Sequence, residues 1–574
     1  MVTRLTLGGA VVAAFLAACS TAQVDQVCVD NCGFDRDVRV ETSFGPVEGY
    51  EDDGVLSYRG IPYAAPPIDE LRWRPPIDPE PWTDTRPATE KPNICPQLAF
   101  AGLPVPGFNP SEDCLYLNVD TPVEGLGIPV MVWIHGGGFT LGEGLQADGG
   151  TAGDLIAREV GAVVVSMNYR LGQLGFLAHS ELSAESSHGA SGNYGLMDQT
   201  AALRWVQENI DRFGGDPDNV TIFGESAGAF SVCSHLASAT SAGLFDKAIL
   251  QSGSCERPWP TLPAAEAQGD AFAAALDCDA EQDVLACMRS KSADDVLAAL
   301  PPAPNFGFNP SLGPTERWGP VLDGSFFTEQ PSDSFSSGNF NQVPTILGFT
   351  REEARLFVWL GEFADPPLDV TADNYEELIA YFVGGNTELA ARAVEQYPLS
   401  DYSEPAVALA AVATDTIFRC PGKLEAAKLS AFVPTYLYQF EYQDGHSQLE
   451  AVLPFIGASL PSYDLGAFHS ADIPYVFGYD PLLVVNLEDG FSTTLNTWEA
   501  GTADRALWIE LLSDFWRFAL TDRPSPLGGF EWPTYDAEAD QHKVYDTTVR
   551  LGSNAAEKCD FWAGEDYLVS ELGE

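Results

Sequence analysis

Basic residues are scarce in this chain of 574 residues. It holds 29 lysines and arginines against 83 aspartates and glutamates, so its formal net charge is −54. A chain with this charge repels the phosphates of nucleic acid and anionic membrane surfaces, which excludes nucleic acid as a partner. The same field disfavours highly anionic substrates and helps to keep the protein in solution.

The chain also opens without an apolar run long enough to cross a bilayer. Arg4 is followed by the run Leu5–Ala18, whose 14 residues are too few for a membrane span. A short apolar run behind one positive charge is typical of the core of an export signal. We therefore expect residues 1–18 to be a signal peptide that is removed from the mature protein.

The end of this run, Leu-Ala-Ala-Cys at 16–19, resembles the bacterial lipobox, in which the cysteine becomes the first mature residue and carries lipid. We expect Cys19 to be lipidated, residues 19–37 to form a tether, and the lipid to anchor the protein to a membrane. Ser20 in the next position favours the outer membrane of a Gram-negative cell. The alternative is an ordinary cleaved signal and a secreted protein.

Metal-site spacings and internal repeats are missing as well. No group of cysteines and histidines has the spacing of a zinc site, so we expect no metal, and nothing in the sequence points to a cofactor. No low-complexity tract interrupts the chain, and 45% of its residues are hydrophobic, which allows a sizeable core. Apolar strand patterns alternate with helical ones such as Ala506–Trp516, which predicts a mostly parallel sheet covered by helices on both faces.

The most informative motif is Gly-Glu-Ser-Ala-Gly at 224–228, which follows the apolar run Val220–Phe223 and precedes a stretch that can open a helix. This context is typical of a nucleophile elbow, whose glycines permit a tight turn that exposes the serine hydroxyl. Ser226 is therefore the candidate nucleophile. A serine that merely caps a helix is the alternative.

A glycine-rich turn lies upstream of the elbow. The apolar run Val130–Ile134 leads into His-Gly-Gly-Gly-Phe at 135–139, where glycines leave backbone N–H groups accessible. Acyl transfer builds negative charge on the former carbonyl oxygen, and backbone donors directed at it stabilise the transition state. We expect Gly137, Gly138 and Ala227 to supply these donors. A loop that only ends a strand is the alternative.

A general base and an acid complete the expected triad. His469 follows a predicted strand at Tyr436–Phe440 and lies late in the chain, as the order serine, acid, histidine requires. A histidine of a surface loop is the alternative. The acid is expected after the strand near Val343, where Glu353 is the first candidate and Glu352 the second. Thr350 and Glu353 also have the spacing of a capping box, which would start a helix without a catalytic role.

These motifs, taken together, resemble those of the type B carboxylesterases, the α/β-hydrolases that include the cholinesterases. Further matching segments are 58–64 (YRGIPYA), 112–119 (EDCLYLNV), 168–172 (NYRLG), 192–196 (GNYGL), 213–217 (FGGDP), 251–254 (QSGS), 319–324 (GPVLDG) and 532–535 (WPTY). The resemblance implies an α/β-hydrolase domain at 38–562, followed by a tail at 563–574. Helical insertions at about 264–301 and 374–413 would then cover the active site.

The resemblance also implies roles for single residues. It places the acid at Glu353, Ser252 in a hydrogen-bond network behind the triad, and Trp259 in the acyl pocket, where ordinary core packing is the alternative. It pairs the cysteines as Cys95 with Cys114, Cys278 with Cys287 and Cys420 with Cys559. Cys28 with Cys32 and Cys233 with Cys255 are leftover pairs that the resemblance does not settle.

The expected function is that of a serine carboxylesterase, which hydrolyses esters to acid and alcohol through an acyl-enzyme. The loop between Cys95 and Cys114 holds 18 residues and no tryptophan. Its length disfavours the long lid of the family's lipases, and its composition disfavours choline binding. A lipase for long-chain esters is one alternative, and a non-catalytic adhesion protein on the same fold is another. The sequence does not name the natural ester or the oligomeric state.

Overall fold

The computed structural model describes residues 37–98, 110–146, 150–300, 318–362, 367–443, 461–486, 492–497, 501–525, 531–553 and 557–568. The expected signal peptide, Cys19, Cys28 and Cys32 lie outside these residues. None of the described helices is both long enough and apolar enough to cross a membrane.

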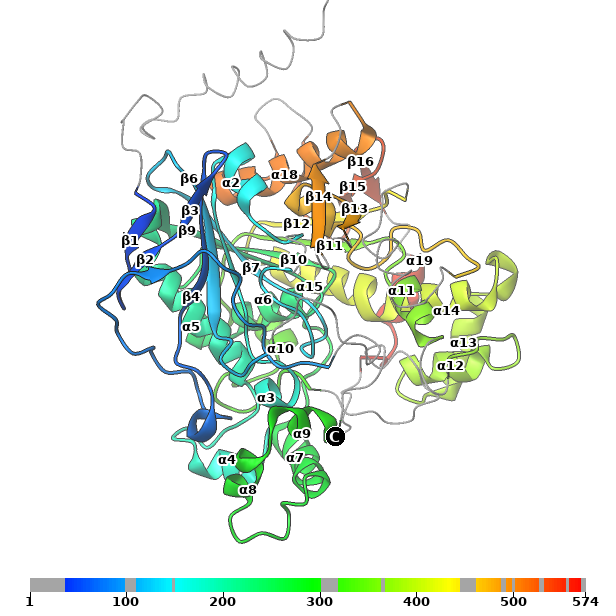
Figure 1. Ribbon diagram of the computed structural model, residues 1–574. Coiled ribbons are helices and arrows are strands. Elements are labelled where there is room, and N and C mark those ends of the chain that lie inside the picture. Colours follow the sequence, from blue (N-terminus) through cyan, green and yellow to red (C-terminus); the bar gives the residue numbers. More distant parts are fainter. Residues whose placement is uncertain are drawn as a thin grey trace, which may run out of the picture.

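Within the described residues, 11 strands form one sheet at the centre of the molecule (Figure 1). In spatial order they are β16 (Arg550–Ser553), β15 (Gln541–Tyr545), β12 (Thr435–Phe440), β11 (Thr345–Thr350), β10 (Lys247–Gln251), β9 (Gly215–Glu225), β7 (Ile128–Ile134), β8 (Val163–Met167), β6 (Tyr116–Pro122), β4 (Val55–Pro62) and β3 (Tyr50–Asp52). Neighbours from β15 through β8 pair in parallel, and the outer pairs are antiparallel. The mostly parallel sheet predicted from the sequence is confirmed.

Both faces of the sheet are covered by helices, because its central strands are apolar on both sides. On β7, Val130 and Val132 join a core with one set of helices, whereas Met131 and Trp133 join a separate core on the other face. The first set is α5 (Tyr194–Asn209), α6 (Ala227–Ala237), α10 (Pro331–Ser337) and α15 (Cys420–Ser430), and the second is α2 (Asp154–Val160), α17 (Ile473–Phe477) and α18 (Ala503–Thr521).

The two expected insertions are helical. The first contains α7 (Leu262–Ala275), α8 (Val284–Ser290) and α9 (Ala293–Ala298), beside α3 (Gly172–Phe176) and α4 (Ser180–Glu185) at the lower end of Figure 1. The second contains α12 (Tyr375–Phe382), α13 (Thr387–Gln396) and α14 (Pro405–Ala413), which pack with α11 (Arg355–Gly361) and α19 (Glu557–Ala563) around a core of their own. A π-helical turn, η8 (Thr414–Arg419), joins α14 to α15.

Small additional strands lie outside the central sheet. They are β1 (Arg39–Glu41), β2 (Pro46–Glu48) and β5 (Arg86–Pro87) in one sheet, and β13 (Tyr479–Asn486) with β14 (Ser492–Thr497) in another.

Four disulfides link the described cysteines. The three pairs implied by the resemblance are confirmed, namely Cys95–Cys114, Cys278–Cys287 and Cys420–Cys559. The structure also joins Cys233 of α6 to Cys255, which the sequence left open. The Cys420–Cys559 bond spans 139 residues and ties α19 to the start of α15, so it restrains the C-terminal end of the described chain.

Glycines at the elbow let α6 approach the sheet closely. A Cβ placed on Gly228 would lie 2.0 Å from the carbonyl oxygen of Ile134, the last residue of β7. Such a contact is impossible, so any side chain at this position forces α6 and β7 apart.

We expect Gly228→Ala to destabilise the fold by about 1–3 kcal/mol, the usual cost of overpacking, and to reduce esterase activity because α6 carries Ala227. Thermal unfolding and ester hydrolysis measure the two effects. Gly422→Ala is the matched control, because its Cβ would meet Phe349 at an ordinary 3.6 Å. An unchanged melting temperature and activity in Gly228→Ala would contradict the close-packing argument.

Candidate active site

Ser226 stands at the turn between β9 and α6. Its φ of 56° and ψ of −123° are an uncommon combination for a residue with a side chain. The turn is held from both sides, since the Ser226 N–H donates to Gln251 O at 2.8 Å and Ser226 O accepts from Phe230 N at 2.9 Å. The side chain is half-buried, as a nucleophile that must receive a substrate requires. The strand, turn and helix predicted around Ser226 are confirmed.

The glycine-rich turn lies directly beside this serine. Gly137 and Gly138 have φ values of 105° and 60°, which favour glycine. A Cβ placed on Gly136 would lie 3.1 Å from the Cβ of Ser226. Ala227 is the first residue of α6, so its N–H has no acceptor within the helix. The three expected oxyanion donors therefore belong to two adjoining turns at one end of the sheet.

His469 and Glu353 form a buried pair across two loops. The imidazole Nδ1 lies 2.6 Å from Glu353 Oε2, and both side chains are excluded from solvent. The other oxygen, Oε1, accepts a hydrogen bond from Thr350 N at 2.7 Å. This bond is one half of the predicted capping box, but the other half is not made, since Thr350 Oγ1 bonds no described residue and α11 begins only at Arg355 with Ala354 as its N-cap. The bond to Thr350 instead orients the carboxylate toward the histidine.

Glu352, the second candidate for the acid, faces a different group. Its Oε2 accepts from Ala467 N at 3.0 Å, and its own N–H donates to Ala467 O at 2.9 Å. His469 N in turn donates to Glu353 O at 3.3 Å. Glu352 thus fastens the histidine loop to the turn that carries Glu353, while only Glu353 reaches the imidazole.

The structure adds Glu225, which the sequence analysis did not single out, to the site. Glu225 Oε1 lies 3.1 Å from His469 Nε2 and accepts from Ser470 Oγ at 2.6 Å. Nε2 makes no hydrogen bond with any described residue, so the nitrogen that should receive the serine proton faces Glu225 in this structure. The position inside the elbow motif, next to Ser226, is the one signal that could have identified Glu225.

Charges around the imidazole decide its protonation. Burial lowers the pKa of His469, but the carboxylates of Glu225 and Glu353 outweigh burial and raise this pKa to about 9. Burial also raises the pKa of Glu225 to about 7. The site therefore stabilises the imidazolium form, which is the form that follows proton transfer from a serine.

Two aromatic rings enclose the imidazole. Phe357 of α11 and Phe418 of η8 lie with ring centroids 4.8 Å and 5.0 Å from that of His469. α11 packs against the second helical insertion and η8 continues from its last helix, so both rings lie on elements next to this insertion.

A buried polar network lies behind the triad, but it is built on Asp472. Its Oδ2 accepts from Gln251 Nε2 at 3.0 Å and from the Tyr438 hydroxyl at 2.8 Å. Ser252 is buried beside it with a φ of 56°. Its hydroxyl makes no hydrogen bond with a described residue, and the network role implied for Ser252 stays a prediction.

Trp259 lies near the elbow helix. Its ring packs edge-on against Phe230 of α6 at a centroid distance of 6.2 Å. The Gln330 side chain holds the Trp259 backbone on both sides, accepting from its N–H and donating to its carbonyl, each at 2.9 Å. This position agrees with a pocket wall, and the acyl-pocket role stays a prediction.

Other histidines serve the structure. His135 stacks on Tyr169 at 4.3 Å, and burial lowers the pKa of His135 to about 4. His235 is buried between Ser241 and Gln199, which lie 2.8 Å and 2.9 Å from its ring nitrogens. Both histidines therefore stabilise the local structure around them. Among the described residues, no group of three or more His, Cys, Asp or Glu side chains could hold a metal ion.

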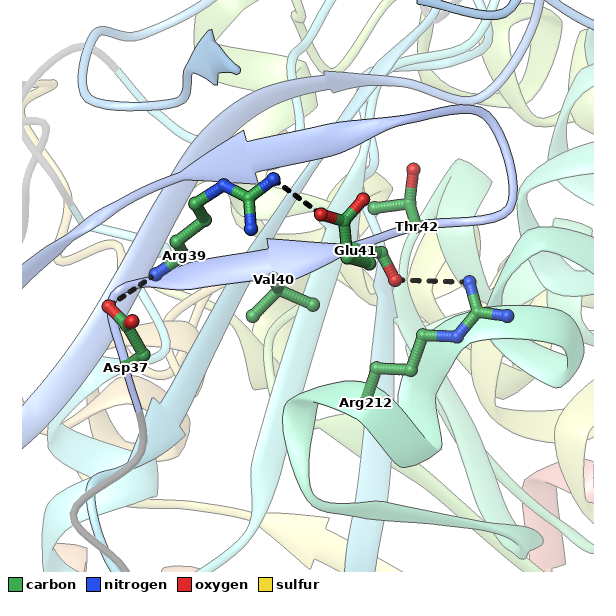
Figure 2. A pocket seen from close by; sticks show the side chains of 6 residues that line it. All are labelled: Asp37, Arg39, Val40, Glu41, Thr42 and Arg212. Atoms are coloured by element: carbon green, nitrogen blue, oxygen red, sulfur yellow. Dashed lines mark hydrogen bonds and ion pairs between the residues drawn. The ribbon is translucent and has the colours of Figure 1, made fainter. Parts of the chain in front are cut away.

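A separate surface hollow lies near the start of β9, at the other end of this strand from Ser226 (Figure 2). It is lined by Asp37, Arg39, Val40, Glu41, Thr42 and Arg212. Arg212 precedes β9 and Ser226 follows it, and a strand of 11 residues spans roughly 36 Å. The polar groups in this hollow bind each other, since Arg39 pairs with the Glu41 carboxylate and Arg212 donates to Glu41 O at 3.1 Å. It is not part of the triad's site.

Comparison with known proteins agrees with this geometry. The model of the carboxylesterase family matches residues 36–562. The chain belongs to this family. The esterase is 34% identical to the para-nitrobenzyl esterase of Bacillus subtilis (strain 168), across 89% of this chain and 95% of that protein. It is also 34% identical to the fumonisin B1 esterase of Sphingopyxis macrogoltabida, across 86% of this chain and 84% of that protein.

Solved structures show the same fold. A PNB esterase matches this carboxylesterase with a TM-score of 0.73 and 33% identity, covering 92% of this chain and all (100%) of that one. A carboxylesterase of Geobacillus stearothermophilus matches with a TM-score of 0.74 and 30% identity, covering 91% and 99%. The protein has the α/β-hydrolase fold and is a serine hydrolase of carboxylic esters.

The two neighbouring glutamates should differ sharply when each is replaced by its amide. We expect Glu353→Gln to lower kcat by about 10⁴-fold, because an amide cannot stabilise the imidazolium and favours the wrong tautomer. Glu352→Gln keeps an oxygen that can accept from Ala467 N, so its kcat should stay within about tenfold of wild type. Steady-state hydrolysis of p-nitrophenyl acetate measures both. A larger loss of kcat in Glu352→Gln than in Glu353→Gln would contradict this assignment and identify Glu352 as the acid.

Removal of the Glu225 charge should change the pH dependence. The reaction needs neutral His469, so kcat/KM rises with pH through the pKa of this group. Because Glu225 raises that pKa, Glu225→Gln should move the rising limb of the profile to lower pH. Profiles of kcat/KM measured over neutral and alkaline pH decide this. If the rising limb of Glu225→Gln stays in place or moves to higher pH, the Glu225 carboxylate does not raise the pKa of His469.

Proposed function

We propose that Ser226, His469 and Glu353 are the catalytic triad of this esterase, with Gly137, Gly138 and Ala227 as the oxyanion hole. The observation that carries the proposal is the buried 2.6 Å contact between His469 Nδ1 and Glu353 Oε2, made beside the elbow that presents Ser226. His469 has two acidic neighbours. Glu353 contacts Nδ1, whereas Glu225 lies beside Nε2, the nitrogen that must receive the serine proton.

The reaction then proceeds in two halves. His469 Nε2 removes the proton of Ser226 Oγ as this oxygen attacks the ester carbonyl, and the backbone N–H groups bind the oxyanion. The imidazolium gives its proton to the leaving alcohol. Water, activated by His469, attacks the acyl-enzyme in the same way and releases the acid. For the imidazole to reach Ser226 Oγ, Nε2 must exchange its contact with Glu225 for one with the serine.

Small or medium neutral esters are the proposed substrates. The net charge of −54 disfavours anionic esters, and the loop closed by Cys95–Cys114 is short for a lipase lid. Trp259 and Phe230 would form part of the acyl pocket. One relative is named para-nitrobenzyl esterase, so p-nitrobenzyl esters are suitable probes beside p-nitrophenyl esters.

Anchoring and location belong to the same proposal. The protein would be exported, lipidated at Cys19 and held at a membrane by a tether that leads to residue 38. The catalytic domain would then face the periplasm or the cell surface, with the outer membrane favoured. The four disulfides of the described chain support this proposal, because disulfides form and persist in an oxidising compartment outside the cytosol.

Chain-length profiling with the purified mature protein tests the activity. Hydrolysis of p-nitrophenyl esters from acetate to palmitate should be fastest at short chains, and Ser226→Ala should lose about 10⁶-fold in kcat. Fastest turnover of palmitate would instead support the lipase alternative. If folded protein hydrolyses none of these esters or p-nitrobenzyl acetate, the proposed substrate class is wrong. Retention of turnover in Ser226→Ala contradicts the nucleophile.

A further inference from the structure

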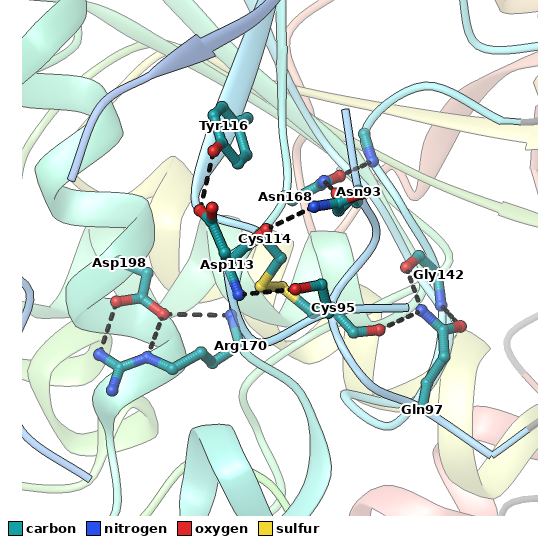
Figure 3. Close-up of a disulfide and its surroundings, with 12 residues drawn as sticks. Asn93, Cys95, Gln97, Asp113, Cys114, Tyr116, Gly142, Asn168, Arg170 and Asp198 are labelled. Atoms are coloured by element: carbon teal, nitrogen blue, oxygen red, sulfur yellow. Dashed lines mark hydrogen bonds and ion pairs between the residues drawn. A yellow bond between two sulfur atoms is a disulfide. The ribbon is translucent and has the colours of Figure 1, made fainter. Parts of the chain in front are cut away.

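Residues 91–97, which include Cys95 of the Cys95–Cys114 disulfide, lie along the end of the glycine-rich loop (Figure 3). Lys91 Nζ pairs with Glu143 Oε2 at 2.5 Å. Asn168 connects the two segments, donating from Nδ2 to Asn93 O at 2.9 Å and accepting from Gly144 N at 2.8 Å. The loop that supplies the oxyanion donors is therefore supported from outside the sheet.

The most direct of these contacts is made by Gln97. Its Oε1 accepts from Gly142 N at 2.8 Å, and its Nε2 donates to Gly142 O at 2.9 Å. One amide thus satisfies both polar groups of a single backbone residue, as a neighbouring strand would in an antiparallel pair. Nε2 also donates to Cys95 O at 3.1 Å, which fixes the amide to the disulfide.

Gly142 closes the loop against its own beginning. It has a φ of 114°, and a Cβ at this position would lie 2.3 Å from His135 Nδ1 and 2.5 Å from Gly136 O. Between these ends, Gly137 O accepts from Leu141 N at 3.0 Å. A displacement of Gly142 therefore reaches Gly137 through one short, hydrogen-bonded turn.

Gln97 is itself held in place. Cys95, two residues before it, is buried and bonded to Cys114, which lies two residues before the start of β6 at Tyr116. Asn93 Nδ2 also donates to Asp113 O at 3.2 Å, on the other side of the same disulfide (Figure 3). The amide is thus anchored to the central sheet and is rigid enough to fix the loop.

We propose that Gln97 is a positioning residue of the oxyanion hole, whose side-chain amide holds Gly142 and so sets the direction of the Gly137 and Gly138 N–H groups. The inference rests on the roles proposed above for these two glycines. Gln97 does not touch the substrate. Its effect appears in the transition state, where the donors must point at the oxyanion and where an error of about 1 Å costs about 10²-fold in rate.

Kinetics of Gln97→Ala and the isosteric Gln97→Glu test this. In Gln97→Glu an oxygen replaces the donor that faces Gly142 O, so the clamp is lost without a change of volume. Both variants should lose about 10- to 100-fold in kcat on p-nitrophenyl acetate, with KM within about twofold of wild type. The Ki of an alkyl trifluoromethyl ketone, whose serine adduct is an oxyanion, should rise by a similar factor.

Two further readouts separate positioning from a loss of folded protein. End-point labelling with a fluorophosphonate should still count one active serine for each chain. The rising limb of the kcat/KM profile against pH should not move, because Glu225, Glu353 and His469 keep their places. Gln207→Ala is the matched control with wild-type kcat, since Gln207 is also half-buried and donates to two carbonyls, Pro217 O and Leu244 O.

The outcomes are distinct. Wild-type kcat and Ki in both Gln97 variants, beside an inactive Ser226→Ala, overturn the inference and leave the proposed function standing. A loss of kcat that matches a loss of labelled serine also overturns it, because Gln97 is then needed only for folding. Activity in Ser226→Ala overturns the proposed function itself, and the inference with it.

Discussion

The parallel register of the central strands is the constraint on which the site depends. Glu225 at the end of β9 pairs with Gln251 of β10, and Gln251 pairs with Gly348 of β11. The strands therefore end in one row, and the residues that follow them emerge at the same edge of the sheet. Ser226 follows β9 directly, and Glu353 follows β11 after a short turn. Without this register, no local motif would bring the serine and the acid to one place.

The histidine reaches this row from outside the sheet and has to be held there. Glu352 fastens its loop through Ala467, and the Glu353 contact fixes the imidazole. Asp472, three residues after His469, is bonded by Gln251 and Tyr438, which belong to the same row of strands. The histidine loop is thus connected to β10 and β12 on one side and to the turn that carries Glu352 and Glu353 on the other.

Amide side chains hold several of the loops that surround the site. Each accepts from the N–H and donates to the C=O of one distant residue, and the pairs are Gln97 with Gly142, Gln330 with Trp259 and Asn193 with Val321. Such a pair satisfies buried backbone groups that a loop cannot satisfy by itself. This explains how segments without regular structure keep a fixed shape next to the sheet.

Much of the fold and the triad could be read from local patterns. The elbow at Ser226, the glycine turn and the late position of His469 each follow from short segments whose backbone requirements only certain residues meet. The identity of the acid could not be derived this way, because Glu353 has the spacing of a capping box and Glu352 is its neighbour. The two differ only in the tertiary structure, where Glu353 contacts the imidazole of His469 and Glu352 accepts from Ala467 N.

The sequence by itself determined which residues are the candidates for the chemistry, since an elbow, a glycine turn and alternating apolar strands are encoded over a few residues each. The tertiary structure decided which groups surround them. Glu225 faces His469, Phe418 packs on it and Gln97 reaches Gly142 because strand register and a disulfide bring distant segments together. Contacts of this kind depend on the whole path of the chain, and no local pattern records them.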